Sequence, residues 1–233
     1  MLELLGRGYC GGHVTLMFTI EDSDPDPINQ GSRGVGICLE DGVEIICRGR
    51  EGKGNLDVFF TDHIGDSRLY IDCLNLLSVG VPEVMEYDWE ATVKLGLPTG
   101  QGFGMSAAGS VSFCNSIQRA IGIPYEEGHR RSLMIAHLVD RKRSSGLGDV
   151  TALSAGGVEI RKIPGSPFNK SISKPESSEI QIRFVFFEKY EAFINEFSSN
   201  VFPVSGGVKI LNFFGEYFFT FFGNKSHISL YFP

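Results

Sequence analysis

The sequence predicts an α+β fold with two domains, and three observations lead to this prediction. Strand patterns precede and alternate with helical patterns over the first two thirds of the chain. A serine- and proline-rich stretch at residues 164–178 predicts a linker. The composition then changes, since 13 of the 19 phenylalanines follow Arg183. We therefore expect an N-terminal domain over residues 1–165 and a Phe-rich C-terminal domain over residues 179–233.

The first half of the chain predicts strands, a hairpin and one helix. β-branched and aromatic residues at 14–20 predict a strand, and the acidic, proline-containing residues 21–30 predict a loop. The apolar runs on either side of Asp41-Gly42 predict a β-hairpin, because this dipeptide suits a two-residue turn. A further strand is expected at residues 56–62, and an amphipathic helix at residues 66–80.

The second half continues this alternation. Residues 89–95 predict a strand that enters a glycine-rich loop, and apolar residues at helical spacing follow up to Ile121. Residues 126–143 carry acids in the first turn and bases in the last, as a helix dipole favours. The remaining expected elements are a strand after Gly156-Gly157, a strand at residues 181–190 and a helix at residues 191–199.

The glycine-rich loop at residues 98–109 is the first candidate site. It places four glycines and two hydroxyls between an expected strand and an expected helix. Glycines allow backbone N–H groups to approach an anion, and a helix N-terminus favours negative charge. The spacing matches neither the P-loop nor the dinucleotide-binding fingerprint. A phosphate site and a tight turn without ligand therefore both remain open at this point.

Two aspartates near the next loop could complete such a site. Asp140 falls in the last turn of the expected helix, and Asp149 ends the segment Ser-Ser-Gly-Leu-Gly-Asp. One acid could hold Mg²⁺ together with Ser106, while the other orients or deprotonates an attacking hydroxyl. The alternative is a solvated acid at a helix end and an ordinary turn or N-cap residue.

The overall composition excludes several classes of protein. A net charge of −7 and an isoelectric point near 5.3 argue against a nucleic-acid partner. No signal-like start and no run of about 20 apolar residues is present, so neither secretion nor membrane insertion is expected. The five cysteines lack a C-x-x-C pair, which predicts reduced thiols in a cytoplasmic protein.

The order of the motifs resembles that of the GHMP kinase superfamily and, more narrowly, the archaeal pantoate kinase family. Six segments carry the resemblance: GHVT at 12–15, GSRGVG at 31–36, GQGFGMS at 100–106, AHLVD at 136–140, SGLGDV at 145–150 and GGVEIRKIPGSP at 156–167. The resemblance implies an N-terminal domain like a ribosomal-protein domain, with a mixed sheet and helices on one side. It also implies that the C-terminal α+β domain is shortened.

The activity that this resemblance implies is ATP- and Mg²⁺-dependent phosphorylation of the terminal hydroxyl of pantoate, giving 4-phosphopantoate in archaeal coenzyme A biosynthesis. A GHMP kinase for another small alcohol, or a catalytically impaired nucleotide-binding homologue, are the alternatives. Dimers are common in the family, so a homodimer is a further expectation.

The resemblance also assigns roles to individual residues. Asp149 would face the acceptor hydroxyl as the catalytic residue, and Ser106 and Asp140 would hold Mg²⁺, although the family usually has glutamate at position 140. The residues expected to bind the ATP phosphates are Pro98, Thr99, Gly100, Gln101, Gly102, Phe103, Gly104, Met105, Ser106 and Ala107. The residues expected near the acceptor are His13, Thr15, Ser32 and Arg33, with Arg161 and Lys162 as possible further charges.

Overall fold

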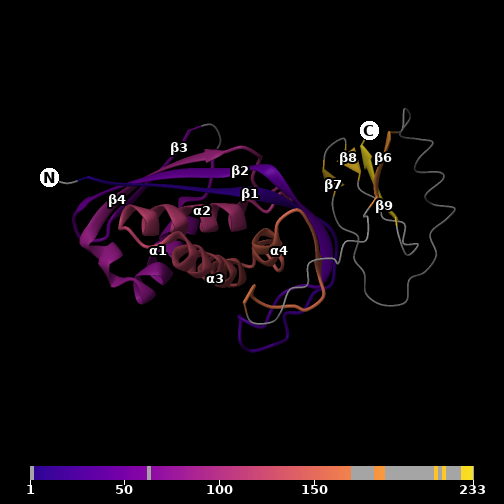
Figure 1. Cartoon of the computed structure of the whole chain (residues 1–233), viewed down its shortest axis with the longest axis horizontal. Helices are drawn as coiled ribbons and strands as arrows, with labels where there is room; N and C mark the ends of the chain where they lie inside the picture. The colour runs from indigo at the N-terminus through magenta and orange to yellow at the C-terminus, as the bar shows by residue number, and fades with distance from the viewer. Residues whose placement is uncertain are drawn as a thin grey trace.

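The computed structural model describes residues 3–61 and 64–168, and the backbone of four short strands at residues 181–186, 213–214, 217–218 and 227–232. In the first two ranges, a five-stranded mixed sheet carries its helices on one face (Figure 1). This arrangement confirms the predicted α+β class and the one-sided layer of helices that the resemblance implies.

The sheet has the order β1-β2-β4-β3, and β5 pairs with the beginning of β2. Within this sheet, β3 and β4 run parallel and the other pairs are antiparallel. The strands are β1 (Leu4–Phe18), β2 (Gly34–Glu51), β3 (Leu56–Phe60), β4 (Tyr87–Leu95) and β5 (Val158–Arg161). The long strands β1 and β2 therefore form the larger part of the sheet, and β5 pairs with the beginning of β2, which starts at Gly34.

Strand β1 begins at Leu4, ten residues before the predicted strand. The early part contains Gly6 and Gly8, which weaken a strand pattern in sequence. In the structure, a Cβ atom on Gly6 or Gly8 would overlap backbone carbonyl oxygens of helix α2 (Met105–Ala120). The two glycines thus allow β1 to lie directly against α2.

The predicted hairpin at Asp41-Gly42 is wrong, because both residues lie inside the single strand β2. Gly42 pairs with Gly11 of β1, and the register shifts between Gly11 and His13. Because β1 is available as a partner on both sides of this point, the dipeptide forms part of an irregularity in the ladder rather than a turn.

The helices are α1 (Ser67–Gly80), α2 (Met105–Ala120), α3 (Tyr125–Arg143) and α4 (Asp149–Ala155), with a 3-10 helix at Pro82–Glu86. Helix α2 lies against β1 and β2 and also packs on α3, and all but three of its 16 residues are buried. Helix α4 was not predicted, because seven residues are too few to show a helical period. Its first residue is Asp149.

The hydrophobic core lies between the sheet and α2. It includes Val43 and Ile45 of β2, Val93 of β4, and Phe113 and Ile117 of α2, all fully buried. This packing fixes the end of β4 relative to the start of α2, and the glycine-rich loop joins these two points. None of the described helices is long and apolar enough to cross a membrane.

Part of the C-terminal region is described as backbone only. Strand β6 (Gln181–Phe186) pairs in parallel with β9 (His227–Phe232), and β7 (Phe213–Phe214) pairs with β8 (Tyr217–Phe218). The strand predicted at 181–190 is thus found in part. The helix predicted at 191–199 and most of the linker lie outside the described residues, and the division into two domains stays a prediction.

Candidate active site

The glycine-rich loop leaves β4 and enters α2 through three residues in the left-handed region. The φ angles of Gly100, Gly102 and Gly104 are 70°, 75° and 62°. Such angles are costly for residues with a side chain, which explains the glycines. The amide of Ala108 donates to the carbonyl of Gly104, so the three preceding amides of α2 have no acceptor within the helix. These amides suit an anion.

The loop is anchored to β1. The backbone amide of His13 donates to the carbonyl oxygen of Phe103 over 2.9 Å. A Cβ atom on Gly104 would lie 3.2 Å from Cβ of His13, so the backbone of the loop and the N-terminal motif touch at this point.

Asp140 occupies a buried position beside the start of α2. Its Oδ1 accepts hydrogen bonds from Ser106 Oγ at 2.8 Å and from Ser145 Oγ at 2.7 Å. Its Oδ2 is buried and has no hydrogen-bond partner among the described residues. Burial raises the pKa of Asp140 to about 6, and the neighbouring Asp149 also raises it. A carboxylate oxygen left without a donor beside a serine hydroxyl fits the oxygen ligands that Mg²⁺ prefers.

Within residues 3–61 and 64–168, no group of three or more His, Cys, Asp or Glu side chains could hold a metal ion alone. Mg²⁺ commonly uses only one or two protein carboxylates, together with water and substrate phosphates. The assignment of Ser106 and Asp140 to such a site stays a prediction.

The second aspartate, Asp149, approaches Asp140 across Gly146. A Cβ atom on Gly146 would lie 2.7 Å from Asp140 Oδ2 and 3.1 Å from Asp149 Oδ2. Only a glycine fits between the two carboxylates without displacing one of them. The motif Ser-Gly-Leu-Gly-Asp thus holds both acids close to the same short piece of backbone.

Two cavities meet at Asp149. A cavity of about 360 Å³ is lined by the glycine-rich loop, Tyr70 and Arg143. A second cavity of about 450 Å³ is lined by Thr15, Ser32 and the loop that precedes α4. The residues that line both are Gly102, Ser145 and Asp149. The arrangement places Asp149 between the cavity of the glycine-rich loop and the cavity of the loop that precedes α4.

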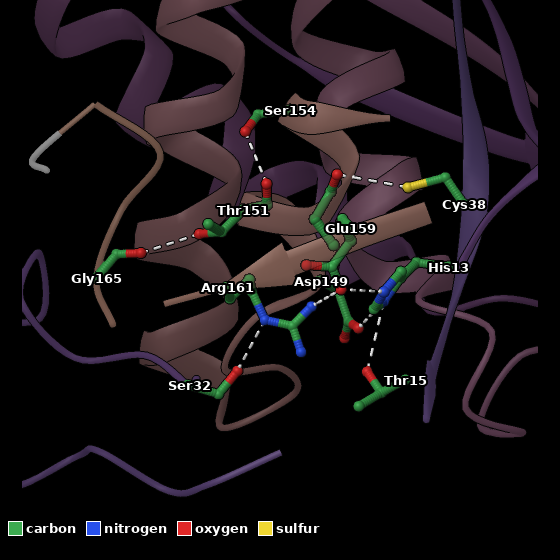
Figure 2. Close-up of polar contacts among 11 residues, drawn as sticks. His13, Thr15, Ser32, Cys38, Asp149, Thr151, Ser154, Glu159, Arg161 and Gly165 are labelled. Atoms are coloured by element: carbon green, nitrogen blue, oxygen red, sulfur yellow. Dashed lines mark hydrogen bonds and ion pairs between the residues drawn. The ribbon is translucent and has the colours of Figure 1, made fainter. Parts of the chain in front are cut away.

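A chain of buried polar groups lies behind Asp149 (Figure 2). His13 Nδ1 lies 2.8 Å from Asp149 Oδ1, and His13 Nε2 lies 3.2 Å from Glu159 Oε1. Glu159 also pairs with Arg161, whose Nε donates to Ser32 Oγ over 3.3 Å. Burial lowers the pKa of His13, but the hydrogen bonds to the two carboxylates outweigh burial, so the pKa is raised.

Comparison with known proteins now identifies the family. No family model matches the chain. A pantoate kinase from Methanospirillum hungatei JF-1 is 31% identical over 160 residues, which cover 67% of this chain and 53% of the relative. A pantoate kinase from Thermococcus kodakarensis is 28% identical over 178 residues, 70% of this chain and 54% of the relative. A solved phosphotransferase related to the coenzyme A biosynthesis pathway is 27% identical, with a TM-score of 0.61 over 71% of this chain and 55% of that one.

The chain belongs to the GHMP kinase superfamily. It spans about half the length of the curated relatives that it matches.

In this GHMP kinase chain, two of the four residues expected near the acceptor line the second cavity, and the other two do not. Thr15 and Ser32 line the second cavity. His13 is fully buried and reaches the cavity only through Asp149. The side chain of Arg33 is 58% exposed and lies 3.8 Å from Glu21, away from the residues that line the cavity.

Glu159 was not predicted, and Arg161 was predicted only as a possible charge near the substrate. A signal was available in the sequence, since Glu159 and Arg161 are two residues apart on a strand and therefore share one face. Two charged residues on one face of a short strand between glycines indicate a buried pair when that face is covered. Such covering is a property of the tertiary structure and is not visible in the strand itself.

The basic residues at the end of α3 divide between the two cavities. Arg143 lines the cavity of the glycine-rich loop and pairs with Asp66 and Asp72. Arg141 lines the second cavity and donates a hydrogen bond to the carbonyl of Gly146. Lys142 pairs with Asp72 on the surface.

Proposed function

We propose that this chain carries the active site of a kinase that uses ATP to phosphorylate the terminal hydroxyl of pantoate, giving 4-phosphopantoate in coenzyme A biosynthesis. The observation that carries the proposal is that the two cavities meet at Asp149. Phosphoryl transfer requires a nucleotide and an acceptor to approach in line, with few protein groups between them. The similarity to pantoate kinases supports the choice of acceptor.

The loop and the start of α2 would bind the phosphates of the nucleotide. The positive φ angles of the loop glycines and the free amides of the first helical turn support this role. Preorganised N–H groups at such a site stabilise charge on the transferred group without needing to reorganise during the reaction.

Ser106 and Asp140 would hold Mg²⁺, which when bound neutralises charge on the phosphates. The unpartnered Oδ2 of Asp140 and the adjacent hydroxyl of Ser106 support this assignment. Aspartate is one methylene shorter than the glutamate usual in the family, so a water molecule could complete the contact, which Mg²⁺ tolerates.

Asp149 would accept the proton of the acceptor hydroxyl, or orient that hydroxyl for attack. Its Oδ1 is engaged by His13, while Oδ2 lies toward Gly146 on the lining of the acceptor cavity. Positioning of the two substrates supplies the larger part of catalysis in such transfers, and proton removal adds to it.

Two arginines are candidates for the carboxylate of the acceptor. Arg33 is exposed beside Glu21, whereas Arg161 is buried, bonded to Ser32, and has an Nη2 without a partner among the described residues. An arginine can bind a carboxylate through two parallel N–H donors. Neither arginine lines the acceptor cavity, so R33K and R161K are compared, and the variant that raises the KM for pantoate more identifies the arginine that approaches the carboxylate.

The test is a coupled assay of ADP release with pantoate, mevalonate and homoserine in turn. Release that depends on pantoate, and that falls by at least about 100-fold in D149N, is the expected result. Preference for another alcohol would assign a different GHMP kinase activity. Binding of ATP without ADP release for any alcohol would identify a nucleotide-binding homologue instead.

We also propose the division into domains at residues 1–165 and 179–233, and a homodimer. The match to the relatives covers about two thirds of this chain, which supports a boundary near the linker. Limited proteolysis should cut first within residues 164–178, and light scattering should give twice the 25.6 kDa mass of the chain.

A further inference from the structure

His13 lies between two carboxylates, and this position limits its protonation state. Its Nδ1 faces Asp149 at 2.8 Å and its Nε2 faces Glu159 at 3.2 Å; the side chains of His13 and Glu159 are buried, and that of Asp149 is 20% exposed. A neutral imidazole has one N–H donor and one acceptor nitrogen, whereas an ionised carboxylate only accepts. Both contacts can therefore be hydrogen bonds to ionised carboxylates only when the ring carries two protons.

The charges around the ring agree with a cation. Asp149 approaches from α4, Glu159 and Arg161 approach from β5, and Thr15 Oγ1 lies 3.5 Å from Nδ1 on β1 itself. Arg161 can offset the charge of one of the two carboxylates, and an imidazolium at His13 can offset the other. An uncompensated charge in such a place would be costly.

Two glycines of strand β2 leave space for Arg161 and for the contact between His13 and Glu159. Gly34 pairs with Arg161, and Gly36 pairs with both Thr15 of β1 and Glu159 of β5. A Cβ atom on Gly36 would lie 2.7 Å from Glu159 Oε1 and would overlap the ring of His13. Because the central strand has no side chain at this position, Glu159 reaches across it to His13 (Figure 2).

We propose that Glu159 is a positioning residue, which accepts the second ring proton of His13 and thereby holds the imidazole as a cation that donates to Asp149. This inference rests on the proposed function, in which Asp149 is the catalytic residue. With Oδ1 of Asp149 fixed by His13, its Oδ2 lies beside Gly146, which lines the acceptor cavity. Glu159 acts only through His13, since it does not line either cavity.

The protonation of His13 can be measured without any activity. In wild-type protein with ¹⁵N-labelled histidine, NMR should show both ring nitrogens of His13 protonated at about pH 7, above the ordinary pKa of about 6.5. The signal is assigned by its loss in H13Q. In E159Q the ring should become neutral at that pH, while E90Q, an exposed change on β4, should leave it unchanged.

A neutral His13 in the wild-type protein at about pH 7 would overturn the proposal, whether or not E159Q folds. Unchanged double protonation in folded E159Q would do the same. Neither outcome depends on the acceptor, so the test stays separate from a failure of the proposed kinase activity.

In the active enzyme, E159Q should lower kcat by about tenfold at pH 8 and move the fall of activity at high pH to a lower pH. The KM for pantoate should change by less than about twofold, because Glu159 does not contact the cavity. E159D, which keeps the charge, should restore part of the pH profile. Equal loss of kcat at every pH, with no recovery in E159D, would assign Glu159 a merely structural role.

Discussion

Replacement of Asp140 by asparagine tests the buried carboxylate of the candidate metal site. Burial raises the pKa of this acid from its ordinary value of 3.8 to about 6. Asparagine has nearly the same shape, and its Oδ1 can still accept hydrogen bonds from Ser106 and Ser145. The substitution therefore removes the charge while keeping most of the contacts.

The expected change in stability follows from proton binding. The folded chain binds the proton of Asp140 more tightly than the unfolded chain does, so ionising this group lowers the free energy of unfolding. The cost is absent below about pH 4, grows up to about pH 6 and is then constant at about 3 kcal/mol. D140N has no group that ionises at this position, so its free energy of unfolding is not lowered in this way. Its free energy of unfolding, minus that of wild type, should rise by about 3 kcal/mol between about pH 4 and pH 7.

Urea denaturation at a series of pH values measures this difference. D57N, at an exposed position on β3, serves as the control and should follow wild type throughout. Millimolar Mg²⁺ with ADP should stabilise wild type more than D140N at about pH 7, because the cation offsets the buried charge. A difference between D140N and wild type that is constant with pH would refute the reasoning about burial. Equal stabilisation of both proteins would refute Asp140 as a metal ligand.

Three further predictions follow from single contacts. S106A should raise the Mg²⁺ concentration needed for half-maximal activity by about tenfold or more. The control S145A removes a similar hydrogen bond to Asp140 and should raise that concentration less. Equal effects of the two variants would contradict Ser106 as a ligand. G104A and G122A should each lower the free energy of unfolding by about 1–2 kcal/mol, because both glycines have positive φ. Only G104A should also weaken nucleotide binding, because its Cβ would lie close to His13. G36A should lower stability by about 1–3 kcal/mol and abolish the doubly protonated signal of His13; a retained signal would show that the network does not need this glycine.

The sequence predicts elements well where a regular pattern is long. Helices α2 and α3 and strand β4 lie close to their expected positions because their periodicity and end signals are strong. The predicted hairpin at Asp41-Gly42 is wrong because both halves of β2 pair with β1. A partner that is distant in the sequence leaves no local signal. The early part of β1 was missed because its glycines serve a close approach to α2.

The candidate site was predictable to a similar degree. The glycine-rich loop, Asp140 and Asp149 stand out because their chemistry and spacing are local. Glu159 does not, because its role depends on β5 lying beside β2 with a glycine between it and His13. Burial of His13 behind Asp149, rather than on the cavity surface, is likewise a consequence of packing that no motif contains.

Phosphorus NMR of a mixture of the purified chain with ATP, Mg²⁺ and pantoate tests most directly whether Asp149 joins two substrate pockets. The account predicts a new phosphomonoester signal coupled to the terminal methylene protons of the product, together with ADP, and no such signal over the same time with D149N. A phosphomonoester formed equally fast by D149N would contradict the role of Asp149, and the absence of any product with the wild-type chain would contradict the proposed reaction.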